Sequence, residues 1–209
     1  MNRRVEGLYV IVDQKAAKGR DLVEVARAAI RGGADVLQLR SKNTGGRELY
    51  EIACALRDVC RAGGAIFIVN DRADVAVASD ADGVHVGQED LPVWAARRAV
   101  GPNRIVGTSV KTSAIAVRAQ EEGADYLGVG SMFPSLTKAD SSVIGPMGLA
   151  EIRAAVQIPV IGIGGVNGDN AGEVLQAGAD GVAVISAVVG AEDVEEAARR
   201  IKQVLSPEC

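Results

Sequence analysis

The sequence predicts an α/β protein, and three observations support that prediction. Eight short apolar runs alternate with segments that have the apolar spacing of amphipathic helices. Most runs end abruptly in polar or charged residues, as happens where an active site lies at the carboxyl ends of buried strands. The hydrophobic content is 48% but the aromatic content only 3%. Ala, Val, Ile and Leu must therefore fill the core, as in parallel sheets covered by helices.

Eight alternating units in a chain of 209 residues favour a closed (β/α)8 TIM barrel, with residues 1–209 forming a single domain. The alternative is an open doubly wound sheet, which usually has about five or six strands. In chain order, the expected strands lie at residues 8–12, 35–39, 65–69, 83–86, 104–107, 125–129, 159–163 and 181–185.

The clearest helical segments lie before the second and third strands and near the end of the chain. Residues 21–31 place their apolar side chains on one stripe, behind an Asp21 cap with Glu24 three residues later. Residues 48–61 and 192–205 repeat the pattern. In the last segment the expected ion pairs are Glu195 with Arg199 and Glu196 with Arg200.

A weak Gly-Ala-Asp repeat marks the junction between a helix and the next strand. It occurs at residues 33–35, 123–125 and 178–180, with a looser copy at 80–83. Glycine suits a left-handed helix end, and Ala-Asp makes a tight turn before the buried run. The repeat supports the division into strand–helix units.

Charge and composition argue against several classes of protein. A net charge of -4 would repel nucleic acid. The apolar segment after the basic start is broken at Asp13, so neither a signal peptide nor a membrane span is expected. Cys54, Cys60 and Cys209 lack metal-ligand spacing and are expected to be reduced thiols. We expect a cytoplasmic protein without nucleic-acid or membrane partners, and homo-oligomer formation is left open.

Two adjacent strand ends have the composition of a phosphate site. Residues 162–165, Gly-Ile-Gly-Gly, follow the seventh strand, and Ile185 and Ser186 follow the eighth, where these barrels commonly bind phosphate. Backbone N–H groups exposed by glycine bind phosphate without a formal charge. The alternative is that the glycines only allow tight packing at a strand end.

The longest connection, residues 131–146, has no helical or strand periodicity. Long loops in compact domains are usually functional lids or disordered insertions. The loop follows the sixth strand and contains Ser135, Thr137 and Lys138. We therefore expect a lid that closes over phosphate, with disorder without function as the alternative.

Cationic and amide side chains follow several of the predicted strands. Arg40, Lys42 and Lys138, with Asn70 as an uncharged donor, meet at one rim only if the barrel is correct. Such a set could hold a diphosphate. The alternative for each cation is a solvated surface charge that contributes little.

Two aspartates at neighbouring strand ends are candidate metal ligands. Asp71 and Asp90 could hold Mg²⁺, which commonly takes one or two carboxylates and fills its other positions with water and phosphate oxygens. The alternatives are structural: a helix cap for Asp90, and a helix cap or an ion pair with Arg72 for Asp71.

Other catalytic patterns are missing from the sequence. His85 is the only histidine, and without a nearby Ser or Cys it makes no nucleophile–base pair. A lone strand histidine is more often structural. The sequence contains no HxxxH or CxxC pair, so a zinc site is not expected. Asn167 stands where a dinucleotide-binding motif would have its last glycine, so a dinucleotide site is not expected either.

Six motifs, in order and at predicted strand ends, resemble those of the thiamine phosphate synthase family over essentially the whole chain. They lie at residues 38–42, 70–72, 83–90, 128–138, 162–165 and 184–186. The family joins an aminopyrimidine methyl diphosphate to a hydroxyethylthiazole phosphate and releases diphosphate. The resemblance implies a transferase of thiamine biosynthesis that uses Mg²⁺ and these two small-molecule substrates.

The resemblance also implies roles for individual residues. The diphosphate substrate would be bound by the predicted catalytic residues Arg40, Lys42, Asn70, Ser109 and Lys138, with Gln38 near its pyrimidine. Asp71 and Asp90 would hold Mg²⁺. The thiazole phosphate would lie against Ser135, Thr137, Gly165, Ile185 and Ser186. His85, which lies in one of the motifs, is counted among the substrate-binding residues.

The residue inventory agrees with this chemistry. The attacking thiazole nitrogen has a lone pair and no proton to lose, so no general base is required. Mg²⁺ and cations would stabilise the departing diphosphate in a dissociative substitution. This mechanism is adopted as a hypothesis.

The chain departs from the family at two positions. Lys111 stands where relatives usually have histidine, and Ser135 where threonine is common. That histidine is the proposed acid–base residue of a thiazole tautomerase in the same family, so Lys111 argues against this alternative. A non-catalytic thiamine-precursor binding protein is the other alternative, and the presence of both Asp71 and Asp90 argues against it.

Overall fold

The computed structural model describes residues 4–134 and 143–206. Eight strands form a closed barrel in which each pairs in parallel with its chain neighbours and β8 pairs with β1. The strands are β1 (Gly7–Asp13), β2 (Val36–Arg40), β3 (Ile66–Asn70), β4 (Gly83–Val86), β5 (Ile105–Val110), β6 (Tyr126–Gly130), β7 (Val160–Ile163) and β8 (Gly181–Val184). The predicted TIM barrel is confirmed, and the alternative of an open sheet is wrong.

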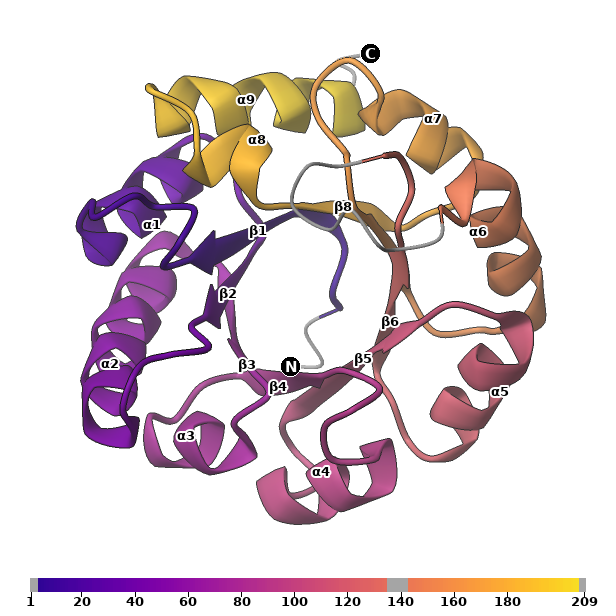
Figure 1. The fold of residues 1–209 in the computed structure, drawn as a ribbon, viewed down its shortest axis with the longest axis horizontal. Helices are drawn as coiled ribbons and strands as arrows, with labels where there is room; N and C mark the ends of the chain where they lie inside the picture. The colour runs from indigo at the N-terminus through magenta and orange to yellow at the C-terminus, as the bar shows by residue number, and fades with distance from the viewer. Residues whose placement is uncertain (1–3, 135–142, 207–209) are drawn as a thin grey trace.

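The helices form a layer around the outside of the barrel (Figure 1). They are α1 (Leu22–Arg31), α2 (Gly46–Gly63), α3 (Ala73–Ala78), α4 (Val93–Val100), α5 (Ser113–Glu121), α6 (Gly145–Ala155), α7 (Ala171–Gln176), α8 (Ser186–Val189) and α9 (Val194–Leu205). The Asp21 cap of α1 is confirmed, since its carboxylate accepts from the Val23 N–H at 2.8 Å. The short α8 is not predicted, because four residues are too few to show a helical period.

The last helix, α9, also has the predicted charge pattern. Arg199 pairs with Glu195 at 2.6 Å and Arg200 pairs with Glu196 at 3.2 Å, each one helical turn apart. A cap that the sequence analysis did not identify starts this helix: the Asp193 carboxylate accepts from the Glu196 N–H at 2.9 Å. The helix is therefore fixed at its start and charged on its solvent side.

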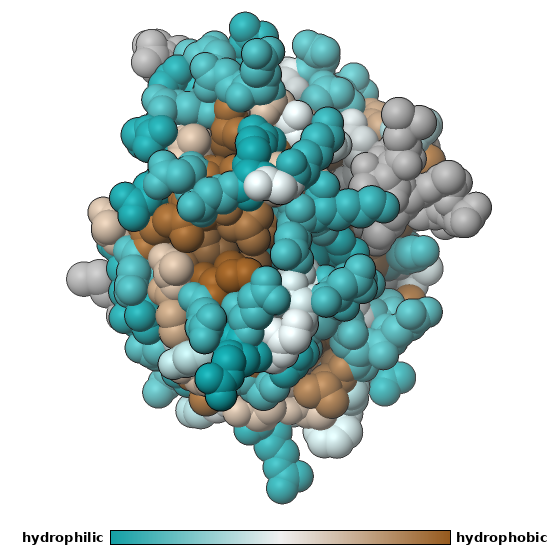
Figure 2. Space-filling view, turned by 60° about the vertical axis from the view of Figure 1, so that its left-hand side comes forward, coloured by the Kyte–Doolittle hydropathy of each residue, from teal (hydrophilic) through white to brown (hydrophobic). Residues whose placement is uncertain are grey.

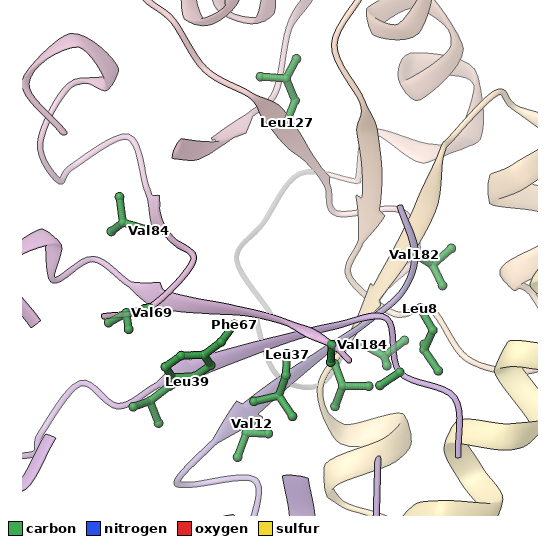
Figure 3. Close-up of a cluster of buried hydrophobic side chains, with 14 of the residues drawn as sticks. Leu8, Val12, Leu37, Leu39, Phe67, Val69, Val84, Leu127, Val182 and Val184 are labelled. Atoms are coloured by element: carbon green, nitrogen blue, oxygen red, sulfur yellow. The ribbon is translucent and has the colours of Figure 1, made fainter. Parts of the chain in front are cut away.

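Side chains alternate between the helix layer and the inside of the barrel. In β1, Leu8 and Val12 belong to the large apolar cluster that strands and helices share, while Tyr9 and Ile11 belong to a second cluster. Figure 3 shows part of the large cluster, with side chains from several strands. The second cluster consists almost entirely of strand residues and fills the barrel interior. This alternation decides which polar residues reach the mouth of the barrel.

The Gly-Ala-Asp repeat lies at the amino-terminal end of the barrel. Its glycines, Gly33, Gly123 and Gly178, have φ angles of 98°, 95° and 94°, which confirms the left-handed helix ends. The repeat aspartates accept from strand N–H groups: Asp35 from Leu8 at 2.7 Å, Asp82 from Phe67 at 2.8 Å, Asp125 from Val106 at 2.7 Å and Asp180 from Val160 at 2.9 Å. Each aspartate thus ties the start of its own strand to the preceding one.

We expect Asp125→Ala to lower the free energy of unfolding by about 2 kcal/mol. The change leaves the Val106 N–H without its carboxylate acceptor and breaks the ion pair with Arg97. Urea unfolding followed by circular dichroism measures the loss. Asp58→Ala is the matched control: Asp58 forms an ion pair with its neighbour Arg57 and its side chain is 68% exposed, so its removal should change stability by less than about 0.5 kcal/mol. Equal losses in both variants would contradict the structural role of the repeat.

The outer surface has a shallow apolar groove between α1 and α2. Val23, Ile30 and Val59 lie along it, with Arg27 and Asp58 among its charged residues. Figure 2, in which this side of the barrel comes forward, shows apolar surface gathered in a hollow. In the described parts of the chain, no helix is long and apolar enough to cross a membrane.

Candidate active site at the carboxyl ends of the strands

The strand register brings the predicted residues of β2 to β5 to one rim of the barrel. Neighbouring pairs in the register are Asp13 with Arg40, Asn70 with His85, and Ser109 with Gly128. Along their strands, these positions fall on the same inward face as Tyr9 and Tyr126, which lie inside the barrel. Their side chains therefore enter the barrel mouth. Of the set predicted to converge, Arg40 and Asn70 meet at this rim, and Ser109, which the family resemblance implied, lies at the same rim.

Arg40 is held by an acidic residue that the sequence analysis did not select. Its guanidinium forms an ion pair with Asp13, whose side chain is only 10% exposed. The other Asp13 oxygen accepts from the Ala16 N–H at 2.9 Å. Asp13 therefore fixes the position of Arg40 and offsets part of its charge. The available signal was the single acidic residue that ends the first apolar run.

Asp71 and Asp90 lie together at the ends of β3 and β4. Burial and a hydrogen bond with the Asp90 carboxyl raise the pKa of Asp71 from 3.8 to about 6, while Lys42 and Arg40 act in the opposite direction. The two aspartates and two cations predicted from the sequence therefore share one electrostatic environment. Asp71 has a left-handed φ of 63°, and its N–H donates to the His85 carbonyl at 2.8 Å.

The structural alternatives for both aspartates are wrong. Arg72 pairs with Asp74 at 2.6 Å, and neither α3 nor α4 begins with a side-chain cap. Asp90 instead accepts from the Gly87 N–H at 2.8 Å, within its own loop. Both carboxylates thus remain near the rim without a role in capping a helix.

The donor set at this rim suits a hard divalent cation bound mainly by carboxylate, water and substrate oxygens. Among residues 4–134 and 143–206, no group of three or more His, Cys, Asp and Glu side chains could hold a metal by itself. Two adjacent carboxylates, one with a raised pKa, fit Mg²⁺, which commonly takes only one or two protein carboxylates.

A buried chain of hydrogen bonds crosses the barrel beneath the rim. The Gln38 Nε2 group donates to the Tyr9 hydroxyl at 2.7 Å, and the Tyr9 and Tyr126 hydroxyls lie 2.8 Å apart. His85 contacts the Tyr126 hydroxyl through Nδ1 and the Ser109 hydroxyl through Nε2, both at 2.9 Å. The chain links Gln38, His85 and Ser109, three predicted site residues from three strands.

Tyr9 and Tyr126 were missed by the sequence analysis. They are two of only three tyrosines, in a chain with very few aromatic residues, and both lie in predicted strands. Both are almost completely buried. Burial raises the pKa of each phenol well above its usual value, so both hydroxyls keep their protons. His85, expected to be structural or substrate-binding, is a buried member of this polar chain.

The predicted phosphate region at the ends of β7 and β8 is tightly packed. Gly164 and Gly165 have left-handed φ angles of 98° and 70°. A Cβ atom would lie 2.5 Å from the Ser131 Oγ at Gly164, and 2.7 Å from the Phe133 carbonyl oxygen at Gly165. The packing alternative is therefore correct for these glycines, but it does not exclude phosphate binding. Ser186 begins α8 and is exposed, and Ile185 before it is half-buried.

Other predicted residues differ in what the structure describes. Ser135, Thr137 and Lys138, and with them most of the predicted lid, lie outside the described residues. Lys42 and Lys111 are exposed, just beyond β2 and β5. Gln88, not selected from the sequence, donates through Nε2 to the Ser109 carbonyl at 2.6 Å. Cys54 and Cys60 are free thiols, as predicted.

Comparison with known proteins gives consistent results. The profile of a family described as thiamine monophosphate synthase matches residues 8–188. A thiamine-phosphate synthase of Moorella thermoacetica is 54% identical over 200 residues, covering 95% of both chains. One of Pyrococcus furiosus is 50% identical over 198 residues, covering 95% of this chain and 94% of the relative.

Solved structures resemble the same barrel. A structure of thiamine phosphate pyrophosphorylase from Pyrococcus furiosus superposes with a TM-score of 0.88 at 49% identity, covering 95% of each chain. A 3-hexulose-6-phosphate synthase, at 20% identity, has a TM-score of 0.69 over 96% of this chain. The second likeness concerns the fold alone.

Proposed function

The chain belongs to the thiamine monophosphate synthase family, and from that membership we propose how its rim residues act. The enzyme is a transferase with thiamine-phosphate synthase activity. Its substrates are 4-amino-2-methyl-5-hydroxymethylpyrimidine diphosphate and 4-methyl-5-(2-hydroxyethyl)thiazole phosphate, and its products are thiamine phosphate and diphosphate. The observation that best supports the site is that Arg40, Lys42 and Asp90 all act on the charge of Asp71.

In this proposal the rim binds the diphosphate and the mouth of the barrel binds the pyrimidine. Arg40 and Lys42 attract the diphosphate oxygens, and Asn70 on β3 and Ser109 on β5 donate hydrogen bonds from inward positions. Gln38 contacts the pyrimidine ring from below. Lys138 supplies a further cation. The ion pair with Asp13 keeps Arg40 aimed at one place, so less side-chain freedom is lost on binding.

Asp71 and Asp90 would hold Mg²⁺ at the same rim. The bound ion supplies positive charge that stabilises the diphosphate as it leaves. The thiazole phosphate lies against Gly165, Ile185 and Ser186, with Ser135 and Thr137 on the loop after β6. Its ring nitrogen attacks the pyrimidine methylene carbon with a lone pair, so no side chain has to remove a proton. A pyrimidine cation formed before the attack remains the hypothesis for this step.

Diphosphate release tests the proposed function directly. The purified protein is incubated with both substrates and Mg²⁺, and diphosphate and thiamine phosphate are measured together. We expect equal amounts of both products, no steady release when the thiazole phosphate is omitted, and loss of synthesis after chelation. A tautomerase would be unaffected by the chelator, and a binding protein would release no diphosphate, so either result would overturn the proposal.

We also expect the stability of the metal-free protein to depend on pH through Asp71. Its folded-state pKa is raised from 3.8 to about 6, so the folded state binds this proton more tightly than the unfolded state. Stability therefore falls as pH rises through this window and is flat above it. Because the carboxyl is half-buried, solvent screening limits the effect to about 1 kcal/mol.

Thermal unfolding with and without Mg²⁺ measures this coupling. At about pH 7.5 the Asp71 carboxyl is ionised, so Mg²⁺ should raise the melting temperature; at about pH 5 a proton on Asp71 competes and the rise should shrink. Asp71→Asn should remove both the pH step and most of the Mg²⁺ effect. A melting temperature that responds to Mg²⁺ equally in both proteins would place the ion elsewhere.

We also propose that residues 1–209 form a single domain, that the protein is cytoplasmic, and that it has no nucleic-acid or membrane partners. The free thiols of Cys54 and Cys60 support a reducing compartment. Homo-oligomer formation is left open.

A further inference from the structure

We propose that Gln38 sets the tautomer of His85 from across the barrel, through the hydroxyls of Tyr9 and Tyr126, and thereby makes Ser109 a hydrogen-bond donor toward the barrel mouth. Four hydrogen bonds of 2.7–2.9 Å connect the five side chains. Gln38 is then a positioning residue for Ser109. The part that concerns substrate rests on the proposed function, whereas the tautomer does not.

The direction of the chain follows from the proton count. The Gln38 Nε2 group can only donate, so the Tyr9 hydroxyl accepts from it. Among the described residues, the Tyr9 hydroxyl has one other hydrogen-bond partner, the Tyr126 hydroxyl. The Tyr9 proton must therefore point toward Tyr126. The Tyr126 hydroxyl, which accepts from Tyr9, places its own proton on the His85 Nδ1 side.

The same count fixes the imidazole and the serine. A His85 ring that accepts at Nδ1 carries its proton on Nε2 when it is neutral, and that N–H faces the Ser109 Oγ at 2.9 Å. Ser109 then accepts from His85 and keeps its own proton for a partner in the barrel mouth. Reversal of the chain would turn the Ser109 proton toward His85 and leave none for a ligand.

The surroundings hold the chain in place. Tyr9 and Tyr126 are 2% and 1% exposed, and their rings are 5.9 Å apart. Gly107 and Gly128 leave space for the rings: a Cβ atom would lie 2.1 Å from Tyr126 at Gly107 and 3.2 Å from His85 at Gly128. Ser109, by contrast, is the last member of the hydrogen-bonded series and is partly exposed. Buried donors and acceptors at one end thus control an accessible hydroxyl at the other.

In the proposed reaction, this hydroxyl donates to an acceptor on the pyrimidine diphosphate. A donor whose direction is fixed before the substrate binds loses little freedom on binding. Tyr126→Phe should then lower kcat/KM by about tenfold, the size expected from one misdirected hydrogen bond. The conservative change keeps the ring and removes only the hydroxyl.

The lone histidine allows a direct test on the ligand-free protein. Two-bond ¹H–¹⁵N correlation spectra distinguish the two neutral tautomers, and they are recorded at about pH 8.5, above the ordinary histidine pKa of about 6.5. We expect the Nε2–H tautomer in the wild-type protein. Gln38→Glu replaces a donor by a carboxylate acceptor of the same shape, so the chain should reverse and the Nδ1–H tautomer should dominate. Gln88→Glu makes the same change beside Ser109, at a residue that does not belong to the series of hydrogen bonds from Gln38 to Ser109. It should leave the Nε2–H tautomer of His85 dominant.

A double variant distinguishes an effect that passes through the hydrogen bonds from the direct electrostatic effect on His85 of the charge that Gln38→Glu introduces. Once Tyr126→Phe has removed the connecting hydroxyl, adding Gln38→Glu should no longer change the tautomer ratio. An Nδ1–H tautomer in the wild-type protein would overturn the inference without any variant. So would a shift by Gln38→Glu that persists when the Tyr126→Phe substitution is also present. Synthesis of thiamine phosphate by the wild-type enzyme is measured separately, so a failed tautomer test and a failed function test remain distinguishable.

Discussion

Asp71→Asn is expected to lower kcat by about 100-fold or more while leaving the fold intact. The variant replaces a carboxyl group by a neutral amide of the same size and leaves Asp90 as the only carboxyl ligand of the pair. The cations Arg40 and Lys42, which now act on the Asp71 charge, would still attract the diphosphate. We therefore expect kcat to fall more than the affinity for the pyrimidine substrate, and the Mg²⁺ concentration for half-maximal rate to rise.

The measurement is steady-state diphosphate release over a Mg²⁺ titration, with circular dichroism to follow the fold. Asp74→Asn is the matched control, three residues along the chain: Asp74 is exposed and pairs with Arg72 at 2.6 Å. It should keep near-normal turnover. Near-normal turnover in Asp71→Asn, or equal losses in the two variants, would remove the assigned role of Asp71.

Gly107→Ala is expected to give the largest loss of stability, about 3 kcal/mol, or a fall in melting temperature of about 10 °C. Gly107 lies beside Tyr126 and His85 in the strand register. An added Cβ would lie 2.1 Å from the Tyr126 Cε1 and Cζ atoms and 2.6 Å from its hydroxyl. The ring is fully enclosed and cannot move aside without disturbing its hydrogen bonds to Tyr9 and His85.

Because the displaced ring belongs to the hydrogen-bonded chain, activity should fall with stability in Gly107→Ala. Gly172→Ala tests the same replacement where there is room: Gly172 lies in α7, and a Cβ there would lie 3.7 Å from Val204 Cγ1, an ordinary van der Waals distance. A helical Gly→Ala change of this kind should be neutral or stabilising by up to about 1 kcal/mol. Denaturant unfolding of both variants decides the point, and an unchanged stability in Gly107→Ala would show that the Tyr126 ring is free to shift.

Polar residues after each apolar run predicted the rim of the barrel correctly. Arg40 and Asn70 end their strands and Ser109 lies next to the last residue of β5, because a closed parallel barrel places all carboxyl ends at one face. Asp71 and Asp90 follow as neighbours for the same reason. Whether either aspartate caps the following helix could not be judged from the sequence, because a cap requires a side-chain hydrogen bond that only the structure reveals. Neither α3 nor α4 begins with such a bond.

Residues inside the barrel were harder to predict. From the sequence, Tyr9 and Tyr126 look like ordinary members of buried strands, and His85 looks like a lone strand histidine. Their hydrogen-bond partners depend on which strands face one another across the barrel interior, and that arrangement depends on the stagger between strands. The Asp13–Arg40 ion pair and the aspartates of the Gly-Ala-Asp repeat belong to the same class, because each joins residues on different strand–helix units.

The sequence by itself determined the number of strand–helix units, the rim at which the polar strand ends meet and most of the charged residues that the structure places at that rim. These features depend on the period of the apolar residues and on where the apolar runs end, and both can be seen in short stretches of sequence. Only the tertiary structure decided the partner of Arg40, the pairing of Asp71 with Asp90, and the buried chain from Gln38 to Ser109. Those contacts arise when the closed barrel sets the stagger and the inward direction of each side chain, and no local pattern contains that information.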